Sequence, residues 1–365
     1  MESELKQILG AILPPDEAAM AAARARQEQL AKPPHSLGRL EDISVKMAGI
    51  TGRIGTAVDR RRVVIFAADN GIAKEGVSSC PQSVTLAQTI NFTRGLTGVA
   101  VLAKHFRTEL DVVDVGIDAE FNQPGVRNRK LAMGTRDFAV EHAMTRAQAV
   151  EALRIGAEAA QRAKDDGVEI LGVGEMGIGN TTTSSAVLSC LLGLPAADTV
   201  SRGAGINDES YRRKIALIDE ALARWQPDPA DPVDALAKVG GFDLAAMCGA
   251  FLGAAALRLP AVIDGFISAV AALCAHRLNP LCAAYMLPSH ASMERGYHLA
   301  MEAMGLEPML NLNMRLGEGS GCPIAFEIVA AAQTVIRDMA TFEEAAIDDG
   351  YLAEIRGNRV YQGEA

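Results

Sequence analysis

One glycine-rich stretch constrains the fold of this chain more than any other part of the sequence. It covers residues 172–183, follows the apolar run 168–171 and continues into residues 184–188, which are predicted to form a helix. A strand, a glycine-rich loop and a helix in this order form an anion site in many α/β proteins. Glycines let the backbone approach a ligand, and the N–H groups at the helix start point towards it. The sequence therefore predicts a loop that binds a phosphate compound.

Part of this stretch has the spacing of a dinucleotide-binding fingerprint, because Gly172, Gly174 and Gly177 follow the pattern G-x-G-x-x-G. Proteins that bind NAD or FAD in this way hold the ribose with an acidic residue at the end of the next strand. Asp198 has about the required spacing, but it follows residues 192–197, which are predicted to form a loop. An NAD-dependent oxidoreductase is therefore kept only as an alternative.

The stretch also has the glycine spacing of a P-loop, but Asn180 stands where a P-loop has the lysine that contacts the outer phosphates of ATP. A single phosphate, held by backbone N–H groups and by the hydroxyls of residues 181–183, fits this loop better. Lys214 follows a second glycine turn at residues 202–205 and is a candidate for the positive charge. The alternative is that the glycines only make tight turns and that Lys214 is solvated.

Continuous apolar runs separated by helical segments predict a parallel sheet. The expected strands are residues 61–68, 110–116, 168–171 and 260–266, and the helical segments between them include residues 85–104, interrupted near Gly95 and Gly98, and residues 147–166. Such runs suit strands that are covered on both faces, and helices of this length between them make βαβ units. We therefore expect an α/β fold with a doubly wound parallel sheet.

Composition narrows the possible partners and the compartment. A net charge of -10 without a basic stripe argues against a nucleic-acid partner. The six cysteines are scattered with no CxxC pair, which in a chain of 365 residues indicates reduced thiols and a cytoplasmic protein. The amino terminus lacks a signal-peptide core, and the most apolar stretch, residues 245–270, is interrupted by Arg258, Pro260 and Asp264. We therefore expect no membrane span.

No metal or cofactor is expected. His290 and His298 lack the spacing of an HExxH helix, and the cysteines do not form a ligand set. The sequence also contains no GxSxG elbow and no recognisable catalytic triad.

Glu318 is the main candidate for acid–base chemistry. It lies between Gly317 and Gly319, so that no neighbouring side chain hinders a substrate from approaching its carboxylate. In an apolar pocket its pKa would rise, which suits a general base near neutral pH. The alternative is an acid that caps a helix or stabilises a turn. Glu175, inside the glycine-rich stretch, would repel a phosphate, and we expect it to position a hydroxyl or to assist proton transfer.

A series of further motifs is spread over nearly the whole chain. They are residues 32–34 with 36–41, 91–95 with 97–99, 115–118, 172–182, 238–243, 264–266, 289–290 and 315–321. In this order and spacing they resemble the motifs of the nicotinate-nucleotide–dimethylbenzimidazole phosphoribosyltransferase family, whose members make the lower-ligand nucleotide of cobamides. The resemblance implies phosphoribosyl transfer from nicotinate mononucleotide to an aromatic base, with release of nicotinate.

The resemblance also implies a role for individual residues. Glu318 matches the catalytic base of the family, and Glu175 matches a second acid of the site. The residues implied at the phosphate are Gly177, Gly179, Asn180, Thr181, Thr182, Gly203, Gly205 and Lys214. Those implied at the ribose and nicotinate are Asp264, Gly265 and Ser292, and those of the base pocket are Cys80, Gln88, Met176 and Leu316.

Family members are homodimers, each chain having a large Rossmann-like domain and a smaller helical domain built from both chain ends. For this chain the resemblance implies a large domain of residues 58–330 and a small domain of residues 1–57 and 331–365. The helix-forming composition of residues 1–57 agrees with this, and the polar tail at residues 345–365 is expected to pack loosely.

The sequence departs from the family pattern at four places, of which the first two, Asn70 and Cys80, fall on or near the acceptor side. Asn70 stands where a histidine is usual, Cys80 where a serine can contact the base, and His35 where a glycine is usual; residues 202–205 differ from some members. These departures leave the identity of the base open. One alternative is a branch that attaches phenolic lower ligands and works as a heterodimer of paralogous subunits. Another is a non-catalytic nucleotide-binding subunit.

Overall fold

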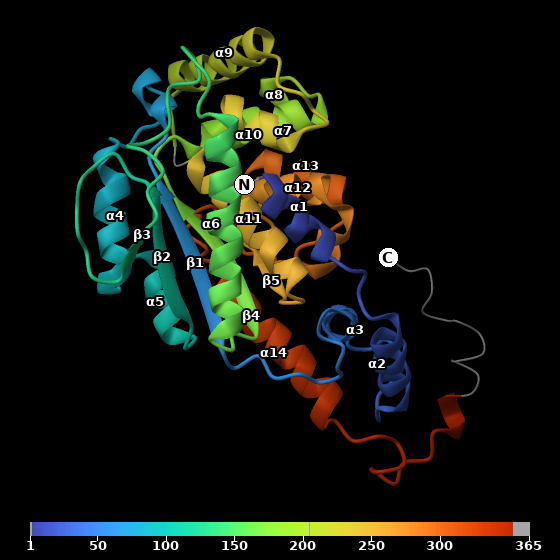
Figure 1. Ribbon diagram of the computed structural model, residues 1–365. Coiled ribbons are helices and arrows are strands. Elements are labelled where there is room, and N and C mark those ends of the chain that lie inside the picture. The colour runs from blue at the N-terminus through green and yellow to red at the C-terminus, as the bar shows by residue number, and fades with distance from the viewer. Residues whose placement is uncertain (1, 204, 353–365) are drawn as a thin grey trace. The chain divides into compact units, whose positions relative to one another are not determined.

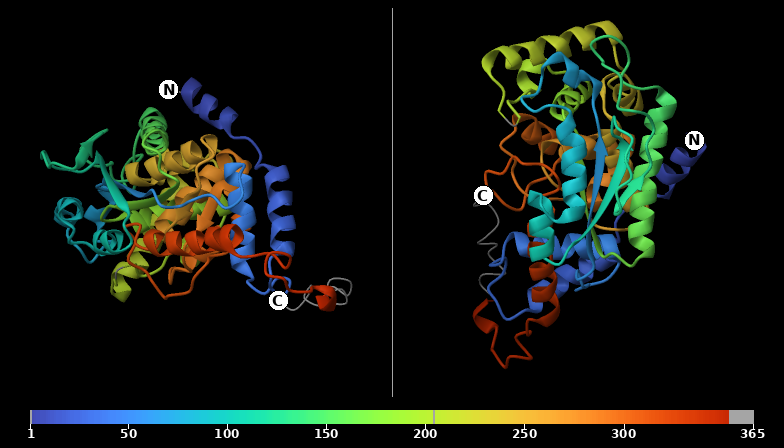
Figure 2. Two further views of the ribbon diagram at one scale, coloured as in Figure 1. Left: turned by 90° about the horizontal axis from the view of Figure 1, so that it is seen from below. Right: turned by 90° about the vertical axis from the view of Figure 1, so that its left-hand side faces the viewer.

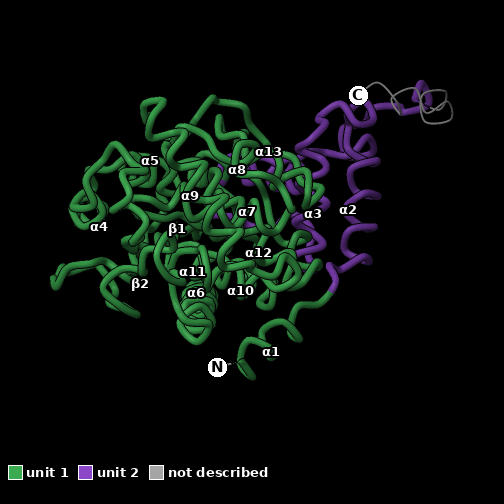
Figure 3. Tube along the Cα trace, turned by 90° about the horizontal axis from the view of Figure 1, so that it is seen from above, with its two compact units in different colours: residues 1–13, 60–325 green, residues 14–59, 326–365 purple. Residues whose placement is uncertain are grey.

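The computed structural model describes residues 2–203 and 205–352 of the chain (Figure 1). It divides into two compact units, one of residues 1–13 and 60–325 and the other of residues 14–59 and 326–365 (Figure 3). The first 13 residues therefore belong to the larger unit rather than with residues 14–57. Helix α1 (Glu2–Ala11) packs on helices of this unit, and Asn279 donates a hydrogen bond of 3.0 Å to the Leu9 carbonyl.

The larger unit, unit 1, is built on six parallel strands. They are β1 (Arg61–Ala68), β2 (Glu109–Gly116), β3 (Val126–Asn128), β4 (Ile170–Met176), β5 (Ala261–Ile263) and β6 (Met286–Pro288). Their order in the sheet is β3-β2-β1-β4-β5-β6, and each neighbouring pair is parallel. The predicted α/β class with a doubly wound parallel sheet is confirmed. This is the strand order of dinucleotide-binding folds, in which the chain changes direction between β1 and β4 and leaves a crevice there.

Helices cover both faces of the sheet. In unit 1 they are α1, α4 (Ser83–Arg94), α5 (Gly98–His105), α6 (Arg146–Asp165), α7 (Asn180–Leu192), α8 (Ala196–Thr199), α9 (Asp208–Trp225), α10 (Pro232–Val239), α11 (Phe242–Ala256), α12 (Phe266–Leu278) and α13 (Arg295–Met304), with the 3-10 helices η1 (Gly71–Glu75) and η2 (Pro280–Tyr285). Helices α4 and α5 lie on one face, and α6, α11 and α12 lie on the other (Figure 2). Helix α14 (Cys322–Asp338) begins in unit 1 and continues into the other unit.

The glycine-rich stretch contains more strand than the sequence predicts. The predicted strand ended at residue 171, whereas β4 continues to Met176 and includes Gly172 and Gly174. Pairing with β1 extends the strand, and Gly174 lies opposite Ile65. A Cβ on Gly174 would lie 2.7 Å from the carbonyl oxygen of Glu318, so this glycine serves close packing of a neighbouring segment.

This geometry does not favour the dinucleotide interpretation. The first two glycines of the fingerprint lie within a strand instead of in the loop that follows it. Asp198, the acid that the interpretation needed at the end of a strand, lies in helix α8. The strand predicted at residues 260–266 is also shorter, because β5 ends at Ile263 and α12 begins at Phe266.

Helices α6 and α11 approach each other closely through glycines. A Cβ on Gly156 would lie 1.8 Å from the carbonyl oxygen of Ala246, and a Cβ on Gly249 would lie 1.9 Å from that of Leu153. Because these overlaps are with backbone atoms, no side-chain rotation relieves them. Helix α11 itself is buried almost throughout its length, as expected for a helix that is apolar on all sides.

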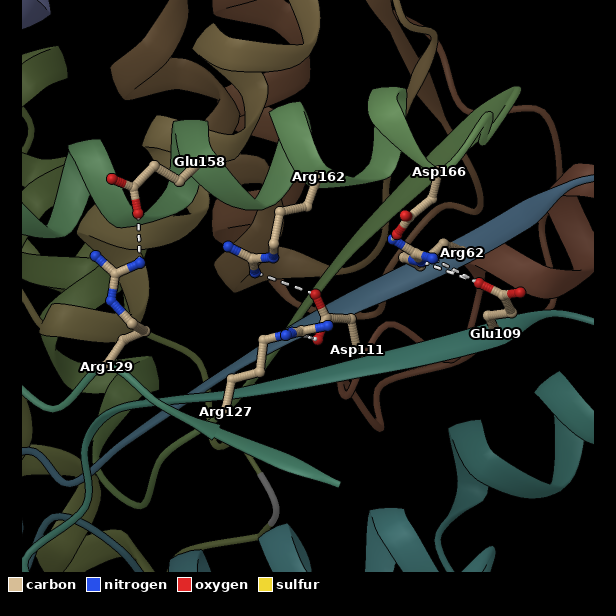
Figure 4. A network of polar contacts seen from close by, with 8 residues as sticks. All are labelled: Arg62, Glu109, Asp111, Arg127, Arg129, Glu158, Arg162 and Asp166. Carbon is tan, nitrogen blue, oxygen red and sulfur yellow. Dashed lines mark hydrogen bonds and ion pairs between the residues drawn. The ribbon is translucent and has the colours of Figure 1, made fainter. Parts of the chain in front are cut away.

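Charged side chains line the outer part of the sheet near β2, β3 and α6 (Figure 4). Buried Asp111 of β2 accepts hydrogen bonds from Arg127 at 2.7 Å and from Arg162 at 3.1 Å. The other pairs of this network are Arg62 with Glu109 and Asp166, and Arg129 with Glu158. Charges on a short edge strand hinder pairing with a strand of another molecule.

The smaller unit, unit 2, is helical. It contains α2 (Glu17–Gln29), α3 (Arg39–Thr51), residues 326–338 of α14 and the 3-10 helix η3 (Gly350–Leu352). Its core includes Ala23, Ala48 and Ile336, and Arg26 donates hydrogen bonds to carbonyls at the end of α14. Residues 353–365 of the predicted loose tail lie outside the described residues. In the described part of the chain, every helix is too short or too polar to cross a lipid bilayer.

We expect Gly249→Ala to destabilise the protein by about 1–3 kcal/mol, because the added methyl group overlaps the backbone of α6. Urea denaturation measures this change. Gly10→Ala in α1 is the matched control, since a Cβ there meets no atom within 4 Å. In the control, alanine should leave stability unchanged or raise it by up to about 1 kcal/mol. Equal effects of the two substitutions would contradict the overlap.

Candidate active site

A cavity of about 260 Å³ opens at the carboxyl ends of the central strands of unit 1. Glu175 and Met176, the last residues of β4, line it, and so does Asp264, which follows β5. It therefore lies beside the crevice where the chain changes direction between β1 and β4, which is where open α/β sheets bind ligands.

Residues 317–321, here called the Glu318 turn, form one wall of the cavity. Glu318 has a φ of 64°, in the left-handed region that costs a non-glycine residue about 1–2 kcal/mol. Two carboxylates hold the turn in place. The backbone N–H of Glu318 donates to Glu175 at 3.1 Å, and the N–H groups of Gly319 and Gly321 donate to Asp264 at 3.0 and 2.6 Å. These buried hydrogen bonds hold the strained backbone conformation, and that conformation sets the direction of the Glu318 side chain.

The Glu318 carboxylate is almost completely buried and points to the start of α5. It accepts hydrogen bonds from the Val99 N–H at 3.2 Å and from Gln88 at 3.4 Å. Burial raises the pKa of Glu318, and the charge of Asp264 adds to this, whereas the hydrogen bonds at α5 and from Gln88 oppose it. A carboxylate with a raised pKa accepts a proton near neutral pH more readily than an ordinary glutamate does.

Glu175 belongs to a second group of buried acids. The side-chain amide of Asn180 donates to Glu175 and also to Asp243, the latter at 3.2 Å. Burial raises the pKa of Glu175 to about 8, with the charge of Asp243 as the next cause, and burial raises the pKa of Asp243 to about 6. The amide of Asn180 is thus engaged with two acids. Sequence reasoning assigned no role to Asp243, although this residue belongs to the motif at residues 238–243.

Lys214 also lines the cavity. It is 1% exposed, and its ammonium group donates a hydrogen bond of 2.8 Å to the hydroxyl of Thr181, in the first turn of α7. Burial lowers the pKa of Lys214 to about 8, and the charge of Glu294 partly opposes this. Gly203, from the second glycine turn, lies close to the Thr181 side chain. A buried ammonium beside a helix start is suited to an anion such as a phosphate.

The structure brings most of the predicted site residues together around this cavity. They are Cys80, Gln88, Glu175, Met176, Gly177, Gly179, Asn180, Thr181, Gly203, Lys214, Asp264, Gly265, Ser292, Leu316 and Glu318. Thr182 and Gly205 are not among the lining residues. Thr182 is fully buried within α7, and its hydroxyl has no hydrogen-bond partner among the described residues.

Several lining residues were missed by sequence reasoning. They include Ser78, Val84, Arg202, Phe266, His290, Glu294 and Arg315. His290 belongs to the motif at residues 289–290, to which no role was assigned, and its ring lies 3.7 Å from the Asp264 carboxylate. Within the described residues, His, Cys, Asp and Glu side chains do not form any group of three or more that could hold a metal ion.

A sequence model of a family described as phosphoribosyltransferase (DBI_PRT) matches residues 12–347, and this chain is a member of that class. It is 50% identical over 357 residues to the nicotinate-nucleotide–dimethylbenzimidazole phosphoribosyltransferase of Clostridium perfringens, covering 98% of this chain and 99% of the relative. The enzyme of the same name from Ruminiclostridium cellulolyticum is 51% identical over 329 residues, covering 90% and 94%.

Solved structures agree with this assignment. The crystal structure of CobT from Thermus thermophilus has a TM-score of 0.88 and 40% sequence identity, covering 91% of this chain and all of that one. The chain therefore belongs to the nicotinate-nucleotide–dimethylbenzimidazole phosphoribosyltransferase family.

The buried acids predict how stability depends on pH. Folding raises the pKa of Glu175 from 4.5 to about 8 and that of Asp243 from 3.8 to about 6. The stabilisation from such groups is fully present below the unfolded values and is lost as pH rises through the folded values. We expect the free energy of unfolding to fall from pH 6 to pH 8 with a slope of up to about 1.4 kcal/mol per pH unit from Glu175, because the contribution of Asp243 is lost mainly below its folded pKa of about 6. Urea denaturation at each pH measures this slope.

Glu175→Gln should flatten the dependence between pH 6 and pH 8, whatever the offset in stability that the substitution itself causes. Glu302→Gln, at an exposed position of α13, is the control and should keep the wild-type slope. Parallel curves for all three proteins would show that Glu175 does not titrate in this range.

Proposed function

We propose that this chain transfers the phosphoribosyl group of nicotinate mononucleotide to 5,6-dimethylbenzimidazole, releasing nicotinate and forming α-ribazole 5'-phosphate for the nucleotide loop of cobalamin. The observation that carries the proposal is one cavity lined by both a buried cation, Lys214, and a buried carboxylate, Glu318. About half of the sequence is shared, over nearly full length, with relatives named for this reaction.

Lys214 and the start of α7 would bind the 5'-phosphate of the donor. The ammonium supplies the charge, and Thr181 can donate its hydroxyl proton because it already accepts the hydrogen bond from Lys214. Gly177, Gly179 and Gly203 let the backbone lie close to the same ligand. Binding the phosphate, remote from the reacting carbon, supplies energy for aligning that carbon with the acceptor.

Glu318 would act as the general base. A ring nitrogen of the acceptor, 5,6-dimethylbenzimidazole, attacks C1' while the bond from C1' to the nicotinate nitrogen breaks, and the configuration at C1' inverts. The pyridinium of the donor takes the electron pair of the broken bond and leaves as neutral-ring nicotinate. The second ring nitrogen of the acceptor gives its proton to Glu318, so that charge and atoms balance.

Glu175 would position the general base, Glu318. It holds the backbone of the Glu318 turn through one carboxylate oxygen, while the raised pKa limits the negative charge that it adds beside Glu318. At the acceptor end, Cys80, Gln88, Met176 and Leu316 supply a mostly apolar surface that suits a planar aromatic base.

We also propose that the enzyme works in the cytoplasm as a homodimer. Six free thiols support a reducing compartment, and the family resemblance supports the dimer. Light scattering of the purified protein tests the assembly, and transfer by this chain alone would rule out a need for a paralogous subunit.

Glu318→Gln tests the chemistry. Because general-base catalysis contributes about 10²- to 10⁴-fold, we expect kcat to fall within this range while nicotinate mononucleotide still binds. Release of nicotinate from the two substrates, with product analysis, measures the rate. Glu302→Gln serves as the control and should retain full activity. Full activity of Glu318→Gln would remove this residue from the mechanism.

Lys214 tests the donor end. In the free enzyme its ammonium is charged below about pH 8, so kcat/KM for nicotinate mononucleotide should fall as pH rises above this value. Lys214→Met should lower kcat/KM by about 10- to 100-fold, the range for loss of a hydrogen bond to a charged group, and should abolish this alkaline decline. Lys6→Met, at an exposed position of α1, is the control. An unchanged alkaline decline in Lys214→Met would assign it to another group.

A further inference from the structure

Four carboxylates line the cavity, and three of them are engaged by the protein itself. Glu175 accepts from the Glu318 N–H and from Asn180. Asp264 accepts from Gly319 and Gly321. The third, Glu318, accepts from the Val99 N–H and from Gln88. The side chain of the fourth, Glu294, accepts no hydrogen bond from any described residue.

Glu294 lies at the entry to α13 and is 8% exposed. Its Oε2 atom is fully buried and has no hydrogen-bond partner among the described residues. The side chain does not cap α13, although Glu294 is the residue that precedes the helix. The backbone N–H of Glu294 donates to Ser292 at 3.3 Å, which fixes the segment that presents both residues to the cavity. A buried carboxylate without partners is costly, and a ligand that donates hydrogen bonds relieves this cost.

The position of Glu294 narrows the kind of ligand group. Glu294 and Lys214 both line the cavity and the charge of Glu294 acts on the ammonium, yet no ion pair joins the two side chains among the described contacts. A carboxylate near the phosphate-binding end repels a phosphate and must face a group that donates hydrogen bonds. In a nucleotide, the groups next to the 5'-phosphate that donate hydrogen bonds are the ribose hydroxyls. Carboxylates often recognise a ribose in this way in nucleotide-binding folds.

We propose that Glu294 recognises a ribose hydroxyl of the donor and so makes the enzyme selective for ribonucleotides over deoxyribonucleotides. This inference rests on the proposed function, since it names the part of the donor that a further residue binds. Asp264, which sequence analysis assigned to the ribose or nicotinate, is less suited to this contact. Both of its carboxylate oxygens already hold the Glu318 turn.

The test compares nicotinate mononucleotide with its 2'-deoxy and 3'-deoxy analogues as donors, using dimethylbenzimidazole as the acceptor. For the wild-type enzyme we expect kcat/KM to be about 10- to 100-fold lower with at least one deoxy analogue, as for loss of a hydrogen bond to a charged group. In Glu294→Ala, kcat/KM with nicotinate mononucleotide should fall to the level of that analogue, so that the selectivity disappears. Glu302→Ala on the same helix should keep both the activity and the selectivity.

Three outcomes overturn the inference. Equal use of all three donors by the wild type shows that neither hydroxyl is recognised. Selectivity that persists in Glu294→Ala assigns the recognition to another residue. A fall of kcat/KM by the same factor for all three donors in Glu294→Ala shows that Glu294 acts only through the charge of Lys214.

Two controls keep these outcomes separate from other failures. Glu294→Gln preserves the size of the side chain and tests the role of its charge if the alanine variant fails to fold. Calorimetric binding of the three donors, without acceptor, reports recognition independently of the reaction. Absence of nicotinate release from wild-type enzyme with any donor would contradict the proposed function, whereas release without selectivity would contradict only the role of Glu294.

Discussion

The cavity depends on two carboxylates that bind backbone instead of substrate. Glu175 and Asp264, at the ends of neighbouring strands, accept three hydrogen bonds from N–H groups of the Glu318 turn. These charge-assisted bonds hold Glu318 in a left-handed conformation that a glutamate rarely adopts. Because Gly174 carries no side chain, the turn can lie directly on β4. The position of Glu318, the proposed general base, is therefore fixed by the sheet itself.

The fold could be predicted from the sequence because its strands are continuous apolar runs. The run at residues 61–68 and β1 coincide, and the predicted parallel sheet is present. The extent of β4 could not be predicted, because glycine has low strand propensity and its presence suggested a loop. Only the packing of β1 and the Glu318 turn against β4 explains why glycines occur within that strand.

Some residues of the candidate site could likewise be predicted from the sequence, and others could not. Residue types and motif order indicated Glu318, Lys214 and Thr181, and the structure places all three on one cavity. Asp243 and Glu294 could not be found in this way, because their significance lies in burial and in their partners. Asp243 becomes notable through Asn180, which it shares with Glu175, and Glu294 through the lack of any partner for its carboxylate among the described residues. Such relations exist only between segments that are far apart in the sequence.

The separation of these segments has a consequence for folding. The Glu318 turn packs on β4, which pairs with β1, so residues near 65, 174 and 318 must all meet before Glu318 is in place. Contacts over such distances close large loops, and parallel pairings of this kind form slowly. A partly folded chain that has formed only α4, α5 and the first strands would lack the complete site. Catalytic competence should therefore be among the last properties that a newly made chain acquires.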